Sequence, residues 1–404
     1  MKRAGTADLP LHYGKVPSWL YERMSKLGLS IIENILMDYG KDEVLKRLAD
    51  PFWFQSFGAV LGMDWHSSGI TTSVMGALKR AINPNSQYLG LYICGGKGKL
   101  SRGTPQEILQ VSDRTGIDGN LMVRNSKLVA KVDNTALQDG YQLYLHNFIL
   151  SDQGKWSVVQ QGMHTFDRTA RRYHWHSDNI KSFVDEPHSA IQGTPQGNIL
   201  NLTASRAAQN RNGILSISRQ DPHMVIKEFR SLLMPKRHHL ESSDVDLGKL
   251  GAMLYITREA DLNSFEDLLL LKGIGPRTMQ SLALVSEVIH GAPCRFEDPA
   301  RFSFAHGGKD GHPFPVPLKV YDQTIEIFQN GITRSTLGPS EKTTAIKRLH
   351  RICIQAGNHF QPNFDLDSVI QKERQEAPKY GGRTVMGKST GANRPSSNIQ
   401  LTLF

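Results

Sequence analysis

The spacing of apolar residues predicts alternating helices and strands in the first half of the chain. From residue 17 to 37, apolar side chains recur every three or four positions, the period of one helix face. The run at 88–94 is short and apolar, as is typical of a strand, and a helix is expected to begin near Thr104. The runs at 141–150 and 156–159 are paired strands or a helix and a strand. These elements indicate a mixed α/β region up to about residue 235.

The pattern changes after residue 236 to helices that are joined by short turns containing Gly and Pro. The expected helices span 247–257, 264–271, 276–290, 319–335 and 340–356. From residue 372 the sequence is polar, without hydrophobic periodicity, which is typical of disorder. We therefore predict an α+β protein with three parts. They are a mixed α/β candidate catalytic domain (1–235), an all-α helical domain (236–371) and a disordered tail (372–404).

The charge of the chain favours a polyanionic partner. The sequence has 48 Lys plus Arg against 38 Asp plus Glu, a formal net charge of +10. Nucleic acid is the commonest intracellular polyanion, although a basic enzyme with part of its charge in the tail has the same balance. No apolar run reaches the roughly 18–20 residues of a membrane helix, so we expect a cytoplasmic protein without a membrane partner. Three widely spaced cysteines, Cys94, Cys294 and Cys353, fit a reducing compartment and cannot form a zinc knuckle.

The segment LLLLKGIGPRTMQSLALVSEVIHG, residues 268–291, resembles the helix-hairpin-helix of DNA repair and replication proteins. Gly273 and Gly275 permit a tight turn, and Pro276 is suited to the first position of the second helix. Backbone amides at such a helix start can hold a DNA phosphate without regard to base sequence. The resemblance therefore implies a DNA-binding turn, and an ordinary helical hairpin is the alternative. Its predicted DNA-binding residues are Lys272, Gly273, Gly275, Arg277 and Thr278.

Asp298 allows a loose comparison with glycosylases of the same superfamily, in which a catalytic Asp follows the hairpin by about two dozen residues. Arg277 stands nearest to the position of the Schiff-base lysine of bifunctional members, and a guanidinium cannot form that adduct. A helix cap before Pro299 is the role that we expect for Asp298, with the catalytic role as the alternative. In a glycosylase, Tyr173 or Trp175 is expected to stack on the flipped base.

The last five residues of the sequence, QLTLF, resemble the peptide by which bacterial DNA enzymes hold the ring-shaped sliding clamp. A partner pocket can bury three large apolar side chains while a glutamine forms a hydrogen bond. The alternative is that the segment folds back as an edge strand. The predicted clamp-binding residues are Gln400, Leu401, Leu403 and Phe404.

Short clusters of His, Asp and Arg in the first 190 residues suggest a catalytic site built from loops. The clusters are RAGTADLPLH, GMDWHSSG, KVDNTALQDG, ARRYHWHSD and DEPHSAI. Carboxylates and imidazoles suit Mg²⁺ or Mn²⁺, or less readily Zn²⁺, and neighbouring Arg and Lys suit a phosphate. The metal or base candidates are Asp8, His12, Asp64, His66, Asp133, Glu186 and His188, of which all but Asp8 and His12 are expected metal ligands. The candidates for phosphate or transition-state stabilisation are Lys131, Arg171 and Arg172.

None of these clusters has a diagnostic spacing, so each can also form caps, turns or ion pairs. GGKGK at 95–99 lacks the frame of a Walker loop, but its glycines can bring amides to a phosphate. Lys97, Lys99 and Arg102 are therefore further DNA-binding candidates.

Several segments closely resemble a prokaryotic family catalogued as domain of unknown function 763. They are RAGTADLPLH, DWHSSGITT, ICGGKGKLSRGTP, KVDNTALQDGYQLYLH, QQGM, ARRYHW, EPHSAI and AHGGKDG. The resemblance covers about residues 1–355, implies membership and brings no catalytic assignment with it.

Together these patterns favour a genome-maintenance protein that binds DNA, is tethered to the sliding clamp at the nucleoid and hydrolyses phosphodiesters with a divalent metal. A helix-hairpin-helix glycosylase and a non-enzymatic DNA and clamp adaptor are the two alternatives.

Overall fold

The computed structural model describes most of the chain. The described residues are 4–6, 9, 16–164, 168–231, 247–260, 262–300, 303–305, 314–315, 318–358, 383–384 and 387–388. Asp8, His12 and the peptide 400–404 lie outside them, as does most of the tail. Contacts divide the chain into two compact units, Met1–His359 and Phe360–Phe404.

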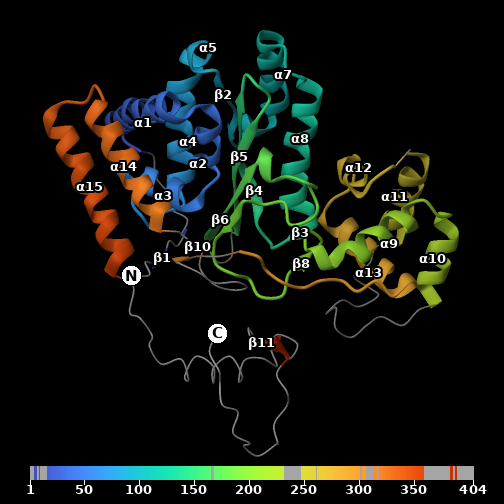
Figure 1. The fold of residues 1–404 in the computed structure, drawn as a ribbon. Coiled ribbons are helices and arrows are strands. Elements are labelled where there is room, and N and C mark those ends of the chain that lie inside the picture. Colours follow the sequence, from blue (N-terminus) through green and yellow to red (C-terminus); the bar gives the residue numbers. More distant parts are fainter. Residues whose placement is uncertain are drawn as a thin grey trace, which may run out of the picture. The chain divides into compact units, whose positions relative to one another are not determined.

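A five-stranded antiparallel sheet lies at the centre of the first unit (Figure 1). Its order is β2-β4-β5-β6-β7, and the strands span Leu91–Lys97, Gln142–Ser151, Trp156–His164, Thr169–His176 and Ala190–Gln192. Side chains alternate between its faces, so Phe148 and Leu150 of β4 enter one core while Ile149 enters the other. Both faces are covered by helices, so most side chains of the sheet are buried, polar ones included.

The first core, on the face that receives Ile149, brings together distant parts of the sequence. Its helices are α1 (Ser18–Tyr39), α2 (Lys41–Leu48), α3 (Pro51–Leu61), α4 (Gly69–Ile82), α14 (Leu318–Arg334) and α15 (Pro339–Asn358). α14 packs on α1 and α15 on α3, so the orange helices lie beside the blue ones in Figure 1. α3 is buried on every side between these layers, which is why its sequence FWFQSFGAVL has no polar face.

The second core covers the opposite face. Its helices are α7 (Thr104–Thr115), α8 (Gly119–Lys131), α9 (Ala208–Ser218), α10 (Pro222–Ser231), α11 (Leu247–Glu259), α12 (Phe265–Leu270) and α13 (Pro276–His290). A turn of π-helix, η2 (Val132–Ala136), continues α8 and packs on α12 and α13. The same core therefore joins the sheet to the helices that follow residue 246.

The remaining elements are short. They are β1 (Ala4–Thr6), η1 (Asn83–Asn85), α5 (Ser86–Leu89), α6 (Lys99–Arg102), β3 (Leu137–Gln138), η3 (Ser177–Asn179), β8 (Leu200–Asn201), η4 (Ser205–Ala207), β9 (Ser303–Ala305), β10 (Phe314–Pro315), β11 (Arg383–Thr384) and β12 (Gly387–Lys388). β3 pairs with β8, and β9 lies between β1 and β10.

The predicted α+β class is confirmed, and so are most of the predicted elements. The helix expected at 17–37 is α1, the helix expected near Thr104 is α7, and the helix expected at 276–290 is α13. The runs at 141–150 and 156–159 are the paired strands β4 and β5. None of the helices in the described ranges is both long and apolar enough to cross a bilayer.

Candidate functional site

The segment ARRYHWHSD was expected in a loop, and that expectation was wrong for its first seven residues. They form most of β6, which is paired on both sides by β5 and β7. Arg171 and Tyr173 face the second core, whereas Arg172 and His174 face the first. All four side chains are fully buried. The charges did not force this segment to the surface, because each polar side chain has hydrogen-bond partners inside.

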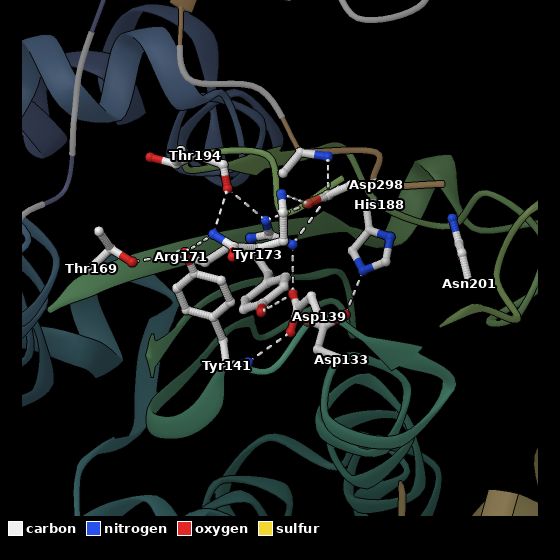
Figure 2. Close-up of polar contacts among 12 residues, drawn as sticks. Asp133, Asp139, Tyr141, Thr169, Arg171, Tyr173, His188, Thr194, Asn201 and Asp298 are labelled. Atoms are coloured by element: carbon white, nitrogen blue, oxygen red, sulfur yellow. Dashed lines mark hydrogen bonds and ion pairs between the residues drawn. The ribbon is translucent and has the colours of Figure 1, made fainter. Parts of the chain in front are cut away.

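Arg171 lies between two buried carboxylates, as Figure 2 shows. Its Nη1 is 2.8 Å from Asp139 Oδ2, and its Nη2 is 2.6 Å from Asp298 Oδ2. Nη2 also donates to the Thr194 carbonyl, and the Tyr173 hydroxyl donates to Asp139. The cluster thus ties β6 to the loop after η2 and to the chain that follows α13.

Burial and charge oppose each other at Arg171. Burial favours the neutral guanidine, but the Asp139 and Asp298 carboxylates outweigh it and raise the pKa of Arg171. Asp298 also accepts from the backbone amides of Gln196 and Ala300, and its side chain is 2% exposed. No helix begins at Asp298, so the expected cap role was wrong.

Arg172 has a different environment on the other face of β6. Its Nη2 donates to the Oε1 atoms of Gln55 and Gln192, and its Nε lies 2.9 Å from His174 Nε2. The guanidinium stacks 4.7 Å above the Phe54 ring. These partners are neutral, and burial lowers the pKa of Arg172 to about 9. Both arginines are fully buried, so neither is placed to meet a phosphate at the protein surface.

Asp133 and His188 form a buried pair beside the Arg171 cluster. His188 Nε2 contacts Asp133 Oδ1, while Oδ2 accepts from Gln160 and from the Trp175 indole at 2.9 Å. The pair continues through Gln160 Oε1, which lies 2.7 Å from His146 Nδ1. Within the described residues, Nδ1 of His188 has no hydrogen-bond partner, and Figure 2 shows it on the side of the ring away from Asp133. A carboxylate that orients an imidazole in this way is an arrangement suited to a general base.

Asp133 belongs to the π-helical turn η2, a rare conformation that is frequent at functional sites. Residues on both sides of η2 bind the start of α13 and the residues just before it. Lys131 Nζ donates to the Ile274 carbonyl at 2.6 Å, and Gln138 Nε2 donates to the Pro276 carbonyl at 2.8 Å. The predicted phosphate ligand Lys131 is therefore half-buried and engaged by the protein itself.

The segment between α12 and α13, residues 271–275, is a tight turn, here named the α12–α13 turn. Gly273 has a φ of 95°, in the left-handed region that favours glycine, and Gly275 precedes the first residue of α13. Ile274 is buried, whereas Lys272 and Arg277 are exposed. Among the described residues, no side chain caps the N-terminus of α13. The predicted DNA-binding residues thus surround an exposed helix start.

The GGKGK segment is a second exposed basic loop, at the end of β2. Gly95, Gly96 and Gly98 all have positive φ angles, and the Gly95 carbonyl accepts from Lys79 at 2.6 Å. Lys79 also binds Glu107, so the base of the loop is held in place. The three predicted phosphate ligands, Lys97, Lys99 and Arg102, are exposed.

The predicted metal ligands do not converge. Asp64 and Glu186 are exposed, His66 is half-buried, and Asp133 and His188 are the two that touch. Across the described ranges, no group of three or more His, Cys, Asp or Glu side chains is placed to hold a metal ion. The described residues thus do not fit the expected divalent metal.

Sequence reasoning missed Gln138 and Gln160 and gave Asp139 no role. Gln138 lies in KVDNTALQDG and Gln160 in QQGM, but an amide side chain gives no chemical signal there, because its importance depends on which carbonyl or carboxylate the fold places opposite it. Asp139 had a usable signal, since it precedes Gly140 in a KVDNTALQDG cluster already rich in charge.

The comparison with protein families gives the family of the chain and no activity. The chain belongs to the family described as protein of unknown function (DUF763), which matches residues 5–316. The match includes the Arg171 cluster, the Asp133–His188 pair and both exposed basic loops. No solved structure matches the chain.

Proposed function

We propose that this chain binds the DNA sugar-phosphate backbone through the α12–α13 turn, acting as a helix-hairpin-helix. The observation that carries the proposal is the exposed, uncapped N-terminus of α13 between the cations Lys272 and Arg277. The first amides of a helix have no acceptor within the helix and carry partial positive charge, so they bind a phosphate without reading a base. The net charge of +10 and the exposed GGKGK loop provide additional attraction.

Fluorescence anisotropy with two duplexes of unrelated sequence tests this proposal. Because phosphate contacts carry no sequence information, both duplexes are expected to bind with similar affinity, and the affinity should fall steeply with salt. A strong preference for one duplex, or binding that salt does not weaken, contradicts the proposal.

The proposed second partner is a bacterial sliding clamp, bound through residues 400–404. The support is the sequence QLTLF, which offers Leu401, Leu403 and Phe404 to an apolar pocket and Gln400 to a hydrogen bond. A clamp-tethered protein is kept at sites of DNA synthesis, which raises its local concentration there. The proposal therefore has the chain act at the nucleoid, in genome maintenance.

Removing residues 400–404 is expected to abolish clamp capture in a pull-down while the thermal unfolding midpoint stays unchanged. Phe404→Ala should also abolish clamp capture. Thr402→Ala should retain it, because Thr402 is not among the predicted clamp-binding residues. Equal clamp capture by the shortened chain and the full chain would contradict the proposal.

The second candidate function is phosphodiester hydrolysis at the Asp133–His188 pair. The observation that favours it is the imidazole held by a buried carboxylate, with its second nitrogen unengaged among the described residues. His188 Nδ1 can take a proton from an attacking water while Asp133 stabilises the imidazolium. The glycosylase alternative is less favoured, since Asp298 is enclosed by Arg171 and the rings of Tyr173 and Trp175 are buried. The third possibility is an adaptor without catalysis, which would require only that the chain bind DNA and the clamp.

A further inference from the structure

We infer that Lys131 and Gln138 are positioning residues of the DNA-binding turn, which they hold with its backbone amides directed outward. The inference rests on the proposed DNA-binding function and adds to it two residues that do not touch DNA. Lys131 is the last residue of α8 and Gln138 lies in β3, on either side of η2. Their side chains donate to the carbonyls of Ile274 and Pro276, which flank Gly275.

The direction of a carbonyl fixes the direction of the next amide. In a trans peptide the C=O of one residue and the N–H of the following residue point in opposite directions. Because the Ile274 carbonyl points toward Lys131, the Gly275 N–H must point away from it. Pro276 is the first residue of α13, so the helix already directs its carbonyl along the axis and the Arg277 N–H toward the helix start, and the bond from Gln138 holds this first turn in place. The Lys131 bond therefore orients the Gly275 amide, and the Gln138 bond fixes the position of the helix start to which a phosphate is proposed to bind.

The same two hydrogen bonds also remove a source of repulsion. A carbonyl oxygen that faced the DNA would repel a phosphate, and a glycine-containing turn can rotate its peptide planes more freely than other segments. Gly273 and Gly275 lie on either side of Ile274, so the Ile274–Gly275 peptide needs support from elsewhere. Lys131 provides this support, since its Nζ lies 2.6 Å from the Ile274 carbonyl oxygen.

The role of Lys131 differs from that of a lysine that contacts a phosphate. Its ammonium is half-buried and already engaged by a carbonyl, and burial lowers its pKa. Its contribution to affinity should thus come from a preorganised turn and not from release of a counterion. These two mechanisms differ in how they change the salt dependence of binding.

The test compares Lys131→Met and Gln138→Leu with Lys127→Met in duplex binding at several salt concentrations. Lys127 is exposed on the same helix, one turn earlier, so Lys127→Met removes the same charge without touching the turn. Lys131→Met and Gln138→Leu are each expected to weaken binding about tenfold, the effect of losing one orienting hydrogen bond, with an unchanged slope of log affinity against log salt. Lys127→Met should bind like the original chain.

Two outcomes overturn the inference. One is a slope for Lys131→Met that is smaller by about one, which assigns Lys131 to a phosphate. The other is unchanged affinity for Gln138→Leu. This variant removes no charge, and it is sufficient as the test if Lys131→Met does not fold. If Lys272→Gln and Arg277→Gln also bind normally, the proposed function fails. If those two weaken binding and the positioning variants do not, this inference alone fails.

Discussion

Arg171→Met is expected to lower the free energy of unfolding by about 3–5 kcal/mol, because it leaves buried carboxylates without their cation. Arg171 is the shared partner of Asp139 and Asp298, and all three side chains are almost fully buried. Methionine fills a similar volume but donates no hydrogen bond to either carboxylate. The measurement is urea unfolding at neutral pH.

Arg258→Met is the matched control for that measurement. Arg258 also lies 2.8 Å from an aspartate, Asp221, but both side chains are nearly half exposed, so solvent screens the pair and little change is expected. Burial raises the pKa of Asp139 while the charge of Arg171 lowers it, so without Arg171 this pKa lies further above its value in the unfolded chain. The folded variant then binds more protons than the unfolded variant. Its loss in free energy of unfolding, relative to the original chain, should therefore become smaller as the pH falls from 7 toward 5. Equal losses in Arg171→Met and Arg258→Met would show that the buried cluster has no special role in stability.

His188→Gln is expected to lower the rate of DNA backbone cleavage by about 10²–10⁴-fold, the usual contribution of a general base. Glutamine keeps a polar side chain beside Asp133 but cannot take a proton at neutral pH. Asp133→Asn should also reduce the rate, because it removes the charge that stabilises the imidazolium. Gel assays of single-stranded, branched and damaged DNA, with Mg²⁺ or Mn²⁺ supplied, measure these rates.

His290→Gln is the control for the cleavage assay, since His290 is exposed at the end of α13. It should cleave at the original rate, and DNA affinity should be unchanged in all three variants. Undiminished cleavage by His188→Gln argues against the base assignment. Base release in EDTA without backbone cleavage would favour the glycosylase, and retained DNA binding with no chemistry would favour the adaptor.

Much of the fold could be predicted because its helices have clear periodicity. α1 buries Met24, Ile31 and Ile35 at helical spacing, so one face of the helix could be identified without a structure. The α12–α13 turn could be located because Gly273, Gly275 and Pro276 have conformational roles that few other residues can fill. Local chemistry of this kind is visible in the sequence itself.

Strand β6, which lies between β5 and β7, was harder to predict, because its charges gave a misleading signal. Arg171 and Arg172 are usually surface residues, and their burial depends on partners that lie far away in the sequence. Asp298 is 127 residues from Arg171, and Gln55 is 117 residues from Arg172. Polar pairing of this kind is determined by the tertiary fold and leaves no periodic pattern.

The candidate site was predicted in part for the same reason. Asp133 and His188 were both expected, but nothing in the sequence shows that they form a pair with each other and not with Asp64 or Glu186. Lys131 was expected to bind a phosphate, and the carbonyl that it binds belongs to a turn 143 residues away. The sequence located the candidate side chains, and the fold determined which of them meet.

The salt dependence of duplex binding by the Lys272→Gln/Arg277→Gln variant tests the DNA-binding account most directly. If both cations lie beside phosphates, the slope of log affinity against log salt should decrease by about two, and the affinity should fall for every duplex alike. Lys227→Gln, at an exposed position on α10, should leave the slope unchanged. An unaltered slope and affinity in the double variant would contradict the account, since the α12–α13 turn would then not be where DNA is bound.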